Sequence, residues 1–124
     1  MRLAKAERVR MSKLPAGTVT LVFTDIEGST RLLQQLGDRY PRLLVEHHRL
    51  LRAAFIRHGG HEVSTEGDAF FVAFTGARDA VAAAAHAQQA LANRPWPEGV
   101  RLGVRVGVHT VAADHSLISP PCNL

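Results

Sequence analysis

The stretch TVTLVFTDIEGST, residues 18–30, decides the fold because its character changes halfway along. Residues 18–24 are β-branched, aromatic or otherwise apolar, which is typical of a central strand covered on at least one face. The acids Asp25 and Glu27 then follow, with Gly28 directly after them. Carboxylates held beside a core lose hydration, so they are costly unless a positive charge lies close to them.

Composition sets the class of protein. The 124 residues suffice for one domain with its own core, and a content of 46% hydrophobic and 21% charged residues is ordinary for a soluble globular protein. The single cysteine, Cys122, cannot form an internal disulfide, which favours a cytoplasmic location. No apolar run approaches the roughly 18 residues that cross a bilayer, so the sequence predicts no membrane span.

Basic residues are concentrated at the start of the chain. The net charge is +4, and Arg2, Lys5, Arg8 and Arg10 all lie in the first ten residues. We interpret residues 1–16 as a basic, disordered leader. The other cations are scattered along the sequence, which predicts no nucleic-acid partner.

Helical signals follow the first strand. Ser29 or Thr30 can cap a first short helix, which Gly37 and Asp38 interrupt. Apolar residues, together with His47, then recur every three or four positions over 40–55, which predicts a second helix with one buried stripe. Asp38 can cap this second helix.

The second half of the chain predicts a hairpin, a helix and a final strand. HEVSTEGDAFFVAF (61–74) indicates two short strands around a tight turn, ARDAVAAAAHAQQALAN (77–93) favours a helix, and RLGVRVGVHT (101–110) alternates apolar residues with others. The structured domain is therefore predicted over 17–110. Residues 111–124 have no apolar period and are predicted as an irregular tail.

The order βαββαβ predicts an α+β fold, a ferredoxin-like split βαβ sandwich with an antiparallel sheet and its helices on one face. In this fold the end of the first strand lies beside the hairpin turn, so we expect Asp25 and Asp68 to lie close together. Neighbouring carboxylates repel each other unless a cation lies between them, and their oxygens suit Mg²⁺ or Mn²⁺. The amides of Gly28, Ser29 and Thr30, at a helix N-terminus, suit phosphate.

Simpler interpretations stay open on the residues alone. Asp25 could cap a turn, and Asp68 could be an ordinary hairpin residue. Glu27 could position the loop or remain solvated. The seven histidines do not form a zinc-like set, since no cysteine cluster accompanies them.

Three segments together resemble a known family. VTLVFTDIEGSTRLLQQLGDRY (19–40), HGGHEVSTEGDAFFVAF (58–74) and VRLGVRVGVHT (100–110) resemble, in order and spacing, the catalytic domain of class III adenylate and guanylate cyclases of the bacterial type. The resemblance covers roughly residues 17–110. It implies a reaction in which a nucleoside triphosphate, ATP or GTP, becomes a cyclic nucleotide and pyrophosphate.

The resemblance also implies roles for individual residues. Asp25 and Asp68 would hold two metal ions, Mg²⁺ or Mn²⁺, with the carbonyl of Ile26 as a further ligand. The amides of Gly28 to Thr30 would hold phosphates. Ser64 stands where active adenylate cyclases usually have a lysine that recognises adenine, so the base preference stays open.

The C-terminal segment departs from the family pattern. After GVHT the family continues to an Asn and an Arg that act on ribose and phosphates, whereas this chain reads VAADHSLISPPCNL (111–124), and no arginine follows Arg105. We interpret the domain as C-terminally truncated and impaired on its own, because loss of one charge-stabilising group costs on the order of 10²- to 10³-fold in rate. Family members are dimers, which implies a homodimer or a heterodimer with a complete cyclase domain.

Two alternatives belong to other functional classes. The chain could be a noncatalytic cyclase-like module for nucleotide binding or dimerisation, which Ser64 and the missing segment favour. DIEGST (25–30) also loosely resembles the Asp-x-Asp loop of phosphatases. The glutamate at the second acidic position and the lack of a downstream lysine and acid pair argue against a phosphatase.

Overall fold

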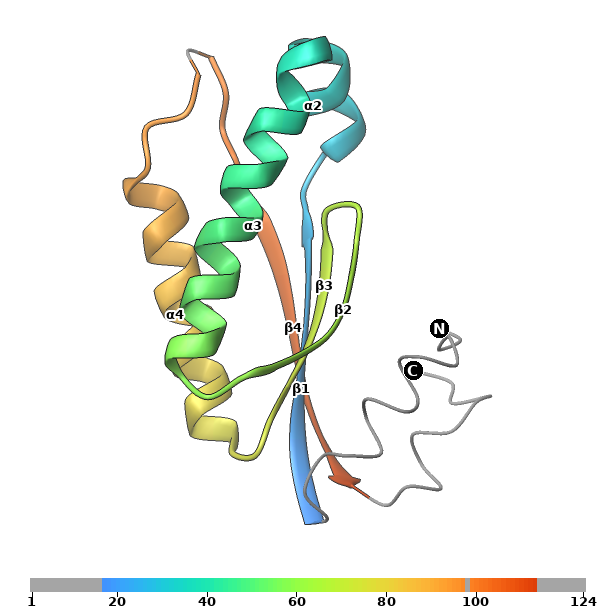
Figure 1. Cartoon of the computed structure of the whole chain (residues 1–124), viewed down its shortest axis with the longest axis vertical. Helices are drawn as coiled ribbons and strands as arrows, with labels where there is room; N and C mark the ends of the chain where they lie inside the picture. The colour runs from blue at the N-terminus through green and yellow to red at the C-terminus, as the bar shows by residue number, and fades with distance from the viewer. Residues whose placement is uncertain (1–16, 98, 114–124) are drawn as a thin grey trace.

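The computed structural model describes residues 17–97 and 99–113 (Figure 1), so the predicted leader and residues 114–124 lie outside the described residues. The elements, in chain order, are β1 (Gly17–Ile26), α2 (Ser29–Leu36), the 3₁₀ turn η1 (Gly37–Arg39), α3 (Tyr40–Arg57), β2 (His61–Glu66), β3 (Ala69–Phe74), α4 (Ala77–Asn93) and β4 (Val104–Ala113).

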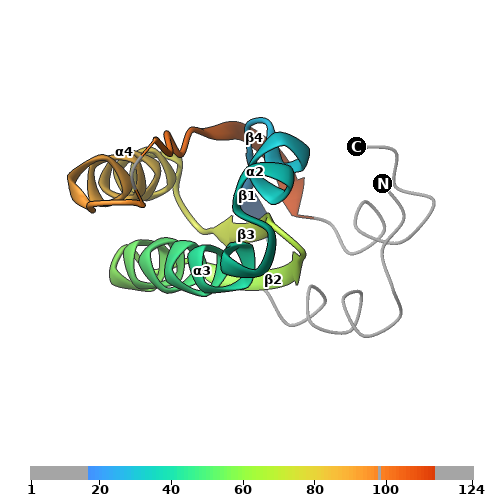
Figure 2. The ribbon, with the colours of Figure 1, turned by 90° about the horizontal axis from the view of Figure 1, so that it is seen from above.

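The four strands form one antiparallel sheet in the order β2-β3-β1-β4. Helices α3 and α4 pack against each other on one side of this sheet, as the view from above shows (Figure 2). The predicted α+β sandwich, with the helices on one face, is therefore confirmed.

The main core lies between the sheet and the helices. Even-numbered residues of β1 and β3 face the helices, because successive side chains of a strand alternate between faces. The buried residues of this cluster include Val22, Ile26, Phe70, Val72, Phe74, Leu43, Leu51, Ala54 and Phe55. On α4 the buried positions Ala80, Ala83 and Ala87 are all alanines, which lets the helix approach the sheet closely.

Odd-numbered residues of β1 point to the opposite face, which we call the second face. It carries a smaller apolar cluster of Val19, Leu21, Val63, Phe71 and Ala73. Within the described residues, no helix covers this face (Figure 2). The ring of half-buried Phe23 stacks on that of Phe71, with centroids 4.5 Å apart and planes 9° apart.

Two local predictions for the helices need correction. The predicted serine or threonine cap of α2 is wrong, because Gly28 occupies the cap position with φ 63° and no side-chain cap bond is made. This left-handed conformation favours glycine, which has no Cβ to clash. Asp38 lies inside η1 rather than at the cap of α3, which begins at Tyr40 with a proline in its first turn.

The final strand lies later in the sequence than predicted. β4 spans Val104–Ala113, and all ten residues of β1 pair with it, from Gly17 opposite Ala113 to Ile26 opposite Val104. Residues 111–113, predicted as the start of the irregular tail, are therefore strand. The C-terminal end of β4 is set by its pairing with β1, since residues 111–113 carry no periodic apolar signal of their own.

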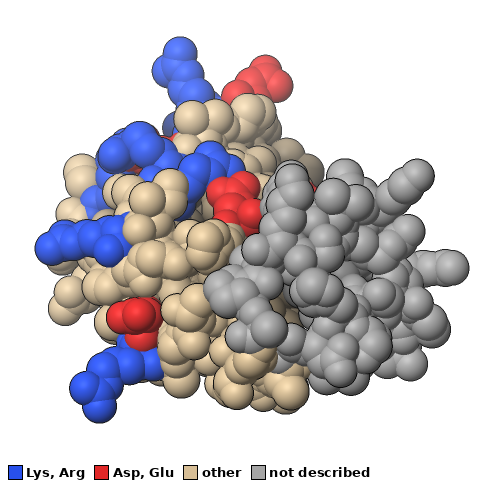
Figure 3. Space-filling model, turned by 60° about the horizontal axis from the view of Figure 1, so that its bottom comes forward, with Lys and Arg blue, Asp and Glu red and all other residues tan. Residues whose placement is uncertain are grey.

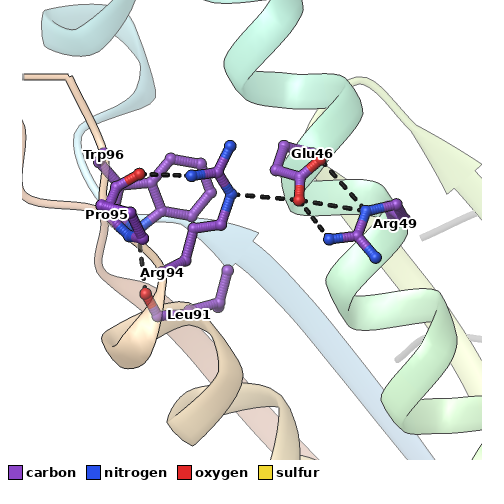
Figure 4. Close-up of polar contacts among 6 residues, drawn as sticks. All are labelled: Glu46, Arg49, Leu91, Arg94, Pro95 and Trp96. Atoms are coloured by element: carbon purple, nitrogen blue, oxygen red, sulfur yellow. Dashed lines mark hydrogen bonds and ion pairs between the residues drawn. The ribbon is translucent and has the colours of Figure 1, made fainter.

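The loop after α4 is fixed by polar contacts (Figure 4). The indole N–H of Trp96 donates to the carbonyl of Leu91 at 2.9 Å, and the Arg94 guanidinium lies 5.1 Å from the centre of the Trp96 ring. Arg94 Nε also donates to Glu46 of α3 at 3.1 Å, and Glu46 pairs with Arg49. This loop leads the chain back into β4.

Charges of both signs lie on the outside of the domain. On the face shown in Figure 3, acidic side chains lie among the basic ones. This mixture is typical of an ordinary solvated surface.

Candidate functional site

Asp25 lies near the end of β1 on the second face, opposite Arg105 of β4 in the strand pairing. The Arg105 guanidinium binds both carboxylate oxygens, with Nε 2.8 Å from Oδ1 and Nη2 2.7 Å from Oδ2. The pKa of Arg105 is raised, mainly because its guanidinium donates hydrogen bonds to Asp25. Asp25 thus already has a cationic partner within its own chain.

Asp68 lies in the turn between β2 and β3, where Gly67 has φ 57°. One Asp68 carboxylate oxygen, Oδ2, accepts a hydrogen bond from the backbone N–H of Ile26 at 2.7 Å. The fold therefore brings Asp68 to the residue that follows Asp25. The turn is held from the other side by His48, whose Nε2 lies 2.8 Å from the carbonyl oxygen of Gly67.

Arg105 lies within the field of three carboxylates. Asp25, Glu27 and Asp68 all act on Arg105 to raise its pKa, with the contact to Asp25 the strongest. Sequence reasoning assigned no site role to Arg105. In the sequence, Arg105 is one charged residue in a segment that alternates apolar residues with others, and nothing else marks it. The strand register that places it opposite Asp25 depends on the tertiary structure.

An open hollow of about 450 Å³ adjoins Asp25 on the second face. Its lining comes from all four strands and consists of Phe23, Thr24, Asp25, Ser64, Glu66, Ala69, Phe70, Phe71, Arg105, Val106 and Gly107. Ser64, the predicted base-contacting residue, therefore shares this hollow with one predicted metal ligand. Asp68 contributes no lining, and its contact to this region runs through the Ile26 amide.

The predicted phosphate-binding turn lies elsewhere. Gly28 lines a separate hollow of about 480 Å³ with Glu27, Arg31, Leu32, Gln35, Gly99 and Arg101, and neither Ser29 nor Thr30 lines the hollow beside Asp25. The first amides of α2 have no partner within the helix, as at any helix start. The structure thus groups Ser64 with Asp25 but not with Gly28 to Thr30.

A buried histidine lies behind the hairpin. His47 of α3 is fully buried, and neither ring nitrogen has a hydrogen-bond partner. Burial, with a smaller contribution from His48, lowers the pKa of His47 to about 4, although Asp68 acts in the opposite direction. His47 is therefore neutral at physiological pH. Sequence reasoning placed it in the buried stripe without anticipating this property.

The predicted donors at the end of β1 have the chemistry that a hard divalent cation prefers. They are the carboxylates of Asp25 and Asp68 and the carbonyl of Ile26, and Mg²⁺ and Mn²⁺ favour oxygen ligands of this kind. Within the part of the chain that the structure describes, no group of three or more histidine, cysteine or acidic side chains could hold a metal. A cation here would need backbone, water or substrate oxygens as well, as is usual for Mg²⁺.

Comparison with known proteins identifies the family. Residues 11–120 match the family described as "Adenylate and Guanylate cyclase catalytic domain", so the chain belongs to that family. It is 34% identical to an adenylate cyclase of Lachancea kluyveri over 114 residues, and 48% identical to the receptor-type adenylate cyclase GRESAG 4.3 of Trypanosoma brucei brucei over 61 residues.

Solved structures show the same fold. A structure of adenylate cyclases from Trypanosoma brucei in their monomeric state superimposes with a TM-score of 0.72 at 32% identity, covering 79% of this chain and 58% of that one. The guanylate cyclase domain of RhGC from Catenaria anguillulae, solved in complex with GTP, gives 0.68 at 20% identity, covering 77% and 57%, which supports the fold alone.

The chain spans only part of these relatives. The match covers 77% of this chain but 6% of the Lachancea protein, and 49% of this chain but 5% of GRESAG 4.3. Within residues 17–97 and 99–113, none of the helices combines the length and hydrophobicity that a membrane span requires.

Proposed function

We propose that this domain carries the metal-binding part of a nucleotide cyclase site, which converts ATP or GTP into a cyclic nucleotide and pyrophosphate. The observation that carries the proposal is the hydrogen bond from the Ile26 amide to Asp68, because it places two acids of distant segments at one strand end. Membership of the cyclase family supplies the reaction class.

The carboxylates of Asp25 and Asp68 and the carbonyl of Ile26 are the groups that would hold two ions, Mg²⁺ or Mn²⁺. When bound, such ions activate the ribose 3′-hydroxyl for attack on the α-phosphate and stabilise the leaving pyrophosphate. Arg105 competes with a cation for Asp25, because the ion pair uses a lone pair of each carboxylate oxygen. The guanidinium of Arg105 also adds positive charge at this edge of the sheet.

Substrate contacts are assigned to two further places. The amides of Gly28, Ser29 and Thr30 would donate to phosphate oxygens at the N-terminus of α2. Ser64 would contact the base in the hollow beside Asp25. A serine hydroxyl both donates and accepts, so it suits either an amino group or a carbonyl of the base, and ATP and GTP remain equal candidates.

A second subunit is part of the proposal. The ribose-orienting Asn and the phosphate-stabilising Arg that the family resemblance implies have no counterpart among the residues that the structure describes after Arg105. A complete cyclase domain as the dimer partner would supply them, whereas a second copy of residues 1–124 would not, because it also has no arginine after Arg105. The single cysteine of the sequence supports a cytoplasmic setting for this assembly.

A noncatalytic role in nucleotide binding or dimerisation is the second candidate. Two observations favour it: the serine at position 64, and the Arg105 ion pair that neutralises Asp25 without a metal. Such a module would bind nucleotide or pair with a complete cyclase domain but release no product by itself.

The decisive experiment incubates the purified chain with Mn²⁺ and either ATP or GTP, and measures cyclic nucleotide and pyrophosphate. The matched control is Asp25→Ala. A parallel sample contains a complete cyclase domain of the same family, which offers the Asn and Arg. Product that depends on Asp25, alone or in the mixture, supports the catalytic proposal.

Thermal unfolding with Mn²⁺ provides the binding half of the test. A cation that binds only the folded chain raises its melting temperature. We expect this rise in the wild type and its loss in Asp25→Ala. Binding without product in either sample supports the noncatalytic candidate, and absence of both binding and product refutes the catalytic proposal.

A further inference from the structure

Strand β2 does not alternate regularly. Glu62 pairs with Val72 of β3, and the next paired residue, Ser64, pairs with Phe71, so Val63 is an extra residue in the ladder. Val63 belongs to the apolar cluster of the second face, and Ser64 lines the hollow on that same face. The bulge therefore turns two successive side chains to one side of the sheet.

The bulge decides which side chains reach the hollow. Beyond it, Thr65 pairs with Phe70 and faces the helices, whereas Glu66 pairs with Ala69 and lines the hollow. In an unbroken strand that started from the same pairing of Glu62, every side chain after Val63 would change face. Thr65 would then enter the hollow, and Ser64 and Glu66 would leave it.

Three side chains hold this irregularity from the helix side, and we call them the β2 clamp: Arg52, Glu62 and Thr65. The Thr65 hydroxyl donates to Glu62 Oε2 at 2.6 Å. Arg52 of α3 donates to the same carboxylate, from Nε to Oε1 at 2.7 Å and from Nη2 to Oε2 at 3.2 Å.

The hydrogen bond between Glu62 and Thr65 depends on the bulge. Residues three apart in a regular strand point to opposite faces, so their side chains cannot meet. Here the extra residue brings both to the helix side, and their contact stabilises the irregular backbone that makes it possible. This bond is therefore specific to the bulged register.

Arg52 fixes the clamp to the rest of the fold. Its guanidinium carbon lies 5.4 Å from the centre of the buried Phe70 ring, and its hydrogen bonds to Glu62 raise the pKa of Arg52. Charge-assisted, two-point contacts of this kind also select geometry. The clamp and the hollow lie on opposite faces of β2, so the clamp does not contact a bound ligand.

We propose that the β2 clamp is a positioning element: by holding the bulge at Val63, it presents Ser64 and Glu66 to a nucleotide in the hollow beside Asp25. The identity of the ligand rests on the proposed function, whereas the effect of the clamp on strand register does not. Arg52, Glu62 and Thr65 act through the backbone of β2.

The test uses the full chain and the variant Thr65→Val, which keeps the β-branched shape and removes the hydroxyl. Arg52→Gln removes the guanidinium that α3 contributes to the clamp. Thr65→Ser keeps a hydroxyl at position 65 and serves as the conservative variant. The matched control is Thr110→Val, which removes another threonine hydroxyl bond, the one to Thr20 at 2.9 Å, at a distance from the hollow. NMR reports the backbone contact between Ser64 and Phe71, and titrations measure the affinities for Mn²⁺ alone and for its ATP and GTP complexes.

We expect Thr65→Val and Arg52→Gln to lose the native contact of Ser64 with Phe71 and to bind the nucleotide complexes about tenfold more weakly. Affinity for Mn²⁺ alone should change much less, because none of the three proposed metal ligands lies on β2 and the hydrogen bond from the Ile26 amide holds Asp68 to β1. Thr65→Ser and Thr110→Val should behave like the wild type. A merely structural role would not separate nucleotide affinity from metal affinity in this way.

The proposal is overturned if both clamp variants keep the contact of Ser64 with Phe71, or if Thr110→Val loses it equally. It is also overturned if the register changes while nucleotide affinity does not. Failure of the proposed function looks different, because the wild type itself would then bind no nucleotide. In that case the NMR contact still decides whether the clamp sets the register.

Discussion

The two faces of the sheet are built from the same strands but carry different kinds of side chain. Towards the helices, β1 contributes Val22 and Ile26 to the main core. On the second face, the same strand presents the stacked ring of Phe23 and the ion-paired carboxylate of Asp25. A period of two residues thus lets one strand serve packing on one side and polar chemistry on the other.

The prediction with the largest expected effect concerns the packing on the helix side, which we expect to contribute most of the stability. Leu51 is fully buried there, so Leu51→Ala should lower the free energy of unfolding by about 3 kcal/mol through lost burial and the cavity left behind. Phe23→Leu on the second face should cost about 1 kcal/mol, because it removes one aromatic pair but keeps an apolar side chain. Urea unfolding measures both.

Val45→Ala is the control, since 67% of Val45 is exposed on the same helix as Leu51, and its effect should be small. If Phe23→Leu costs as much as Leu51→Ala, the two faces contribute equally and the comparison fails.

The pH dependence of stability should come from the helix side as well. The pKa of His47 is about 4 in the folded chain and 6.5 in the unfolded chain, so the unfolded state takes up a proton first as pH falls. The contribution of His47 to the free energy of unfolding is therefore fully present above pH 6.5. It is lost as the pH falls towards 4, and the total loss is about 3 kcal/mol. Urea unfolding at a series of pH values measures the slope.

His47→Leu removes the titrating group and should flatten the curve between pH 6.5 and 4. His61→Gln, at an exposed position, is the matched control and should leave the slope intact. An unchanged slope in His47→Leu would show that other groups cause the acid sensitivity.

Sequence patterns were sufficient for the layers of this fold because burial has a strong period. Alternation in β1 and the three- and four-residue spacing in α3 each assign a buried face without knowledge of neighbours. The order of the elements then limits the sheet topology, and this placed the turn with Asp68 beside the end of β1. These inferences need only local periodicity and general rules of chain connection.

Features that depend on pairing were missed. HEVSTE reads as a regular strand, and only the partner residues Val72 and Phe71 reveal the extra residue at Val63. Likewise, nothing local to Arg105 indicates that its position in the register is opposite Asp25. Register is set by the whole sheet, so a single strand does not encode it.

The smallest expected effect concerns the charge balance of the second face. Arg105 contacts both oxygens of Asp25, so it competes with a cation for this carboxylate and places a second positive charge near it. Arg105→Gln should therefore tighten binding of Mn²⁺ to the full chain, but only about threefold, because the pair is exposed to solvent and exposed ion pairs are weak. The electron paramagnetic resonance signal of free Mn²⁺ measures this affinity during a titration.

Arg49→Gln is the matched control for the loss of one positive charge. Arg49 also pairs with an acid, Glu46, but within α3 and on the helix side, so its removal should not alter Mn²⁺ affinity. Raising the salt concentration should narrow the difference between Arg105→Gln and the wild type, because screening weakens the exposed pair. If Arg105→Gln instead weakens Mn²⁺ binding, Arg105 supports the cation site rather than competing for it, and the second face balances its charges by another arrangement.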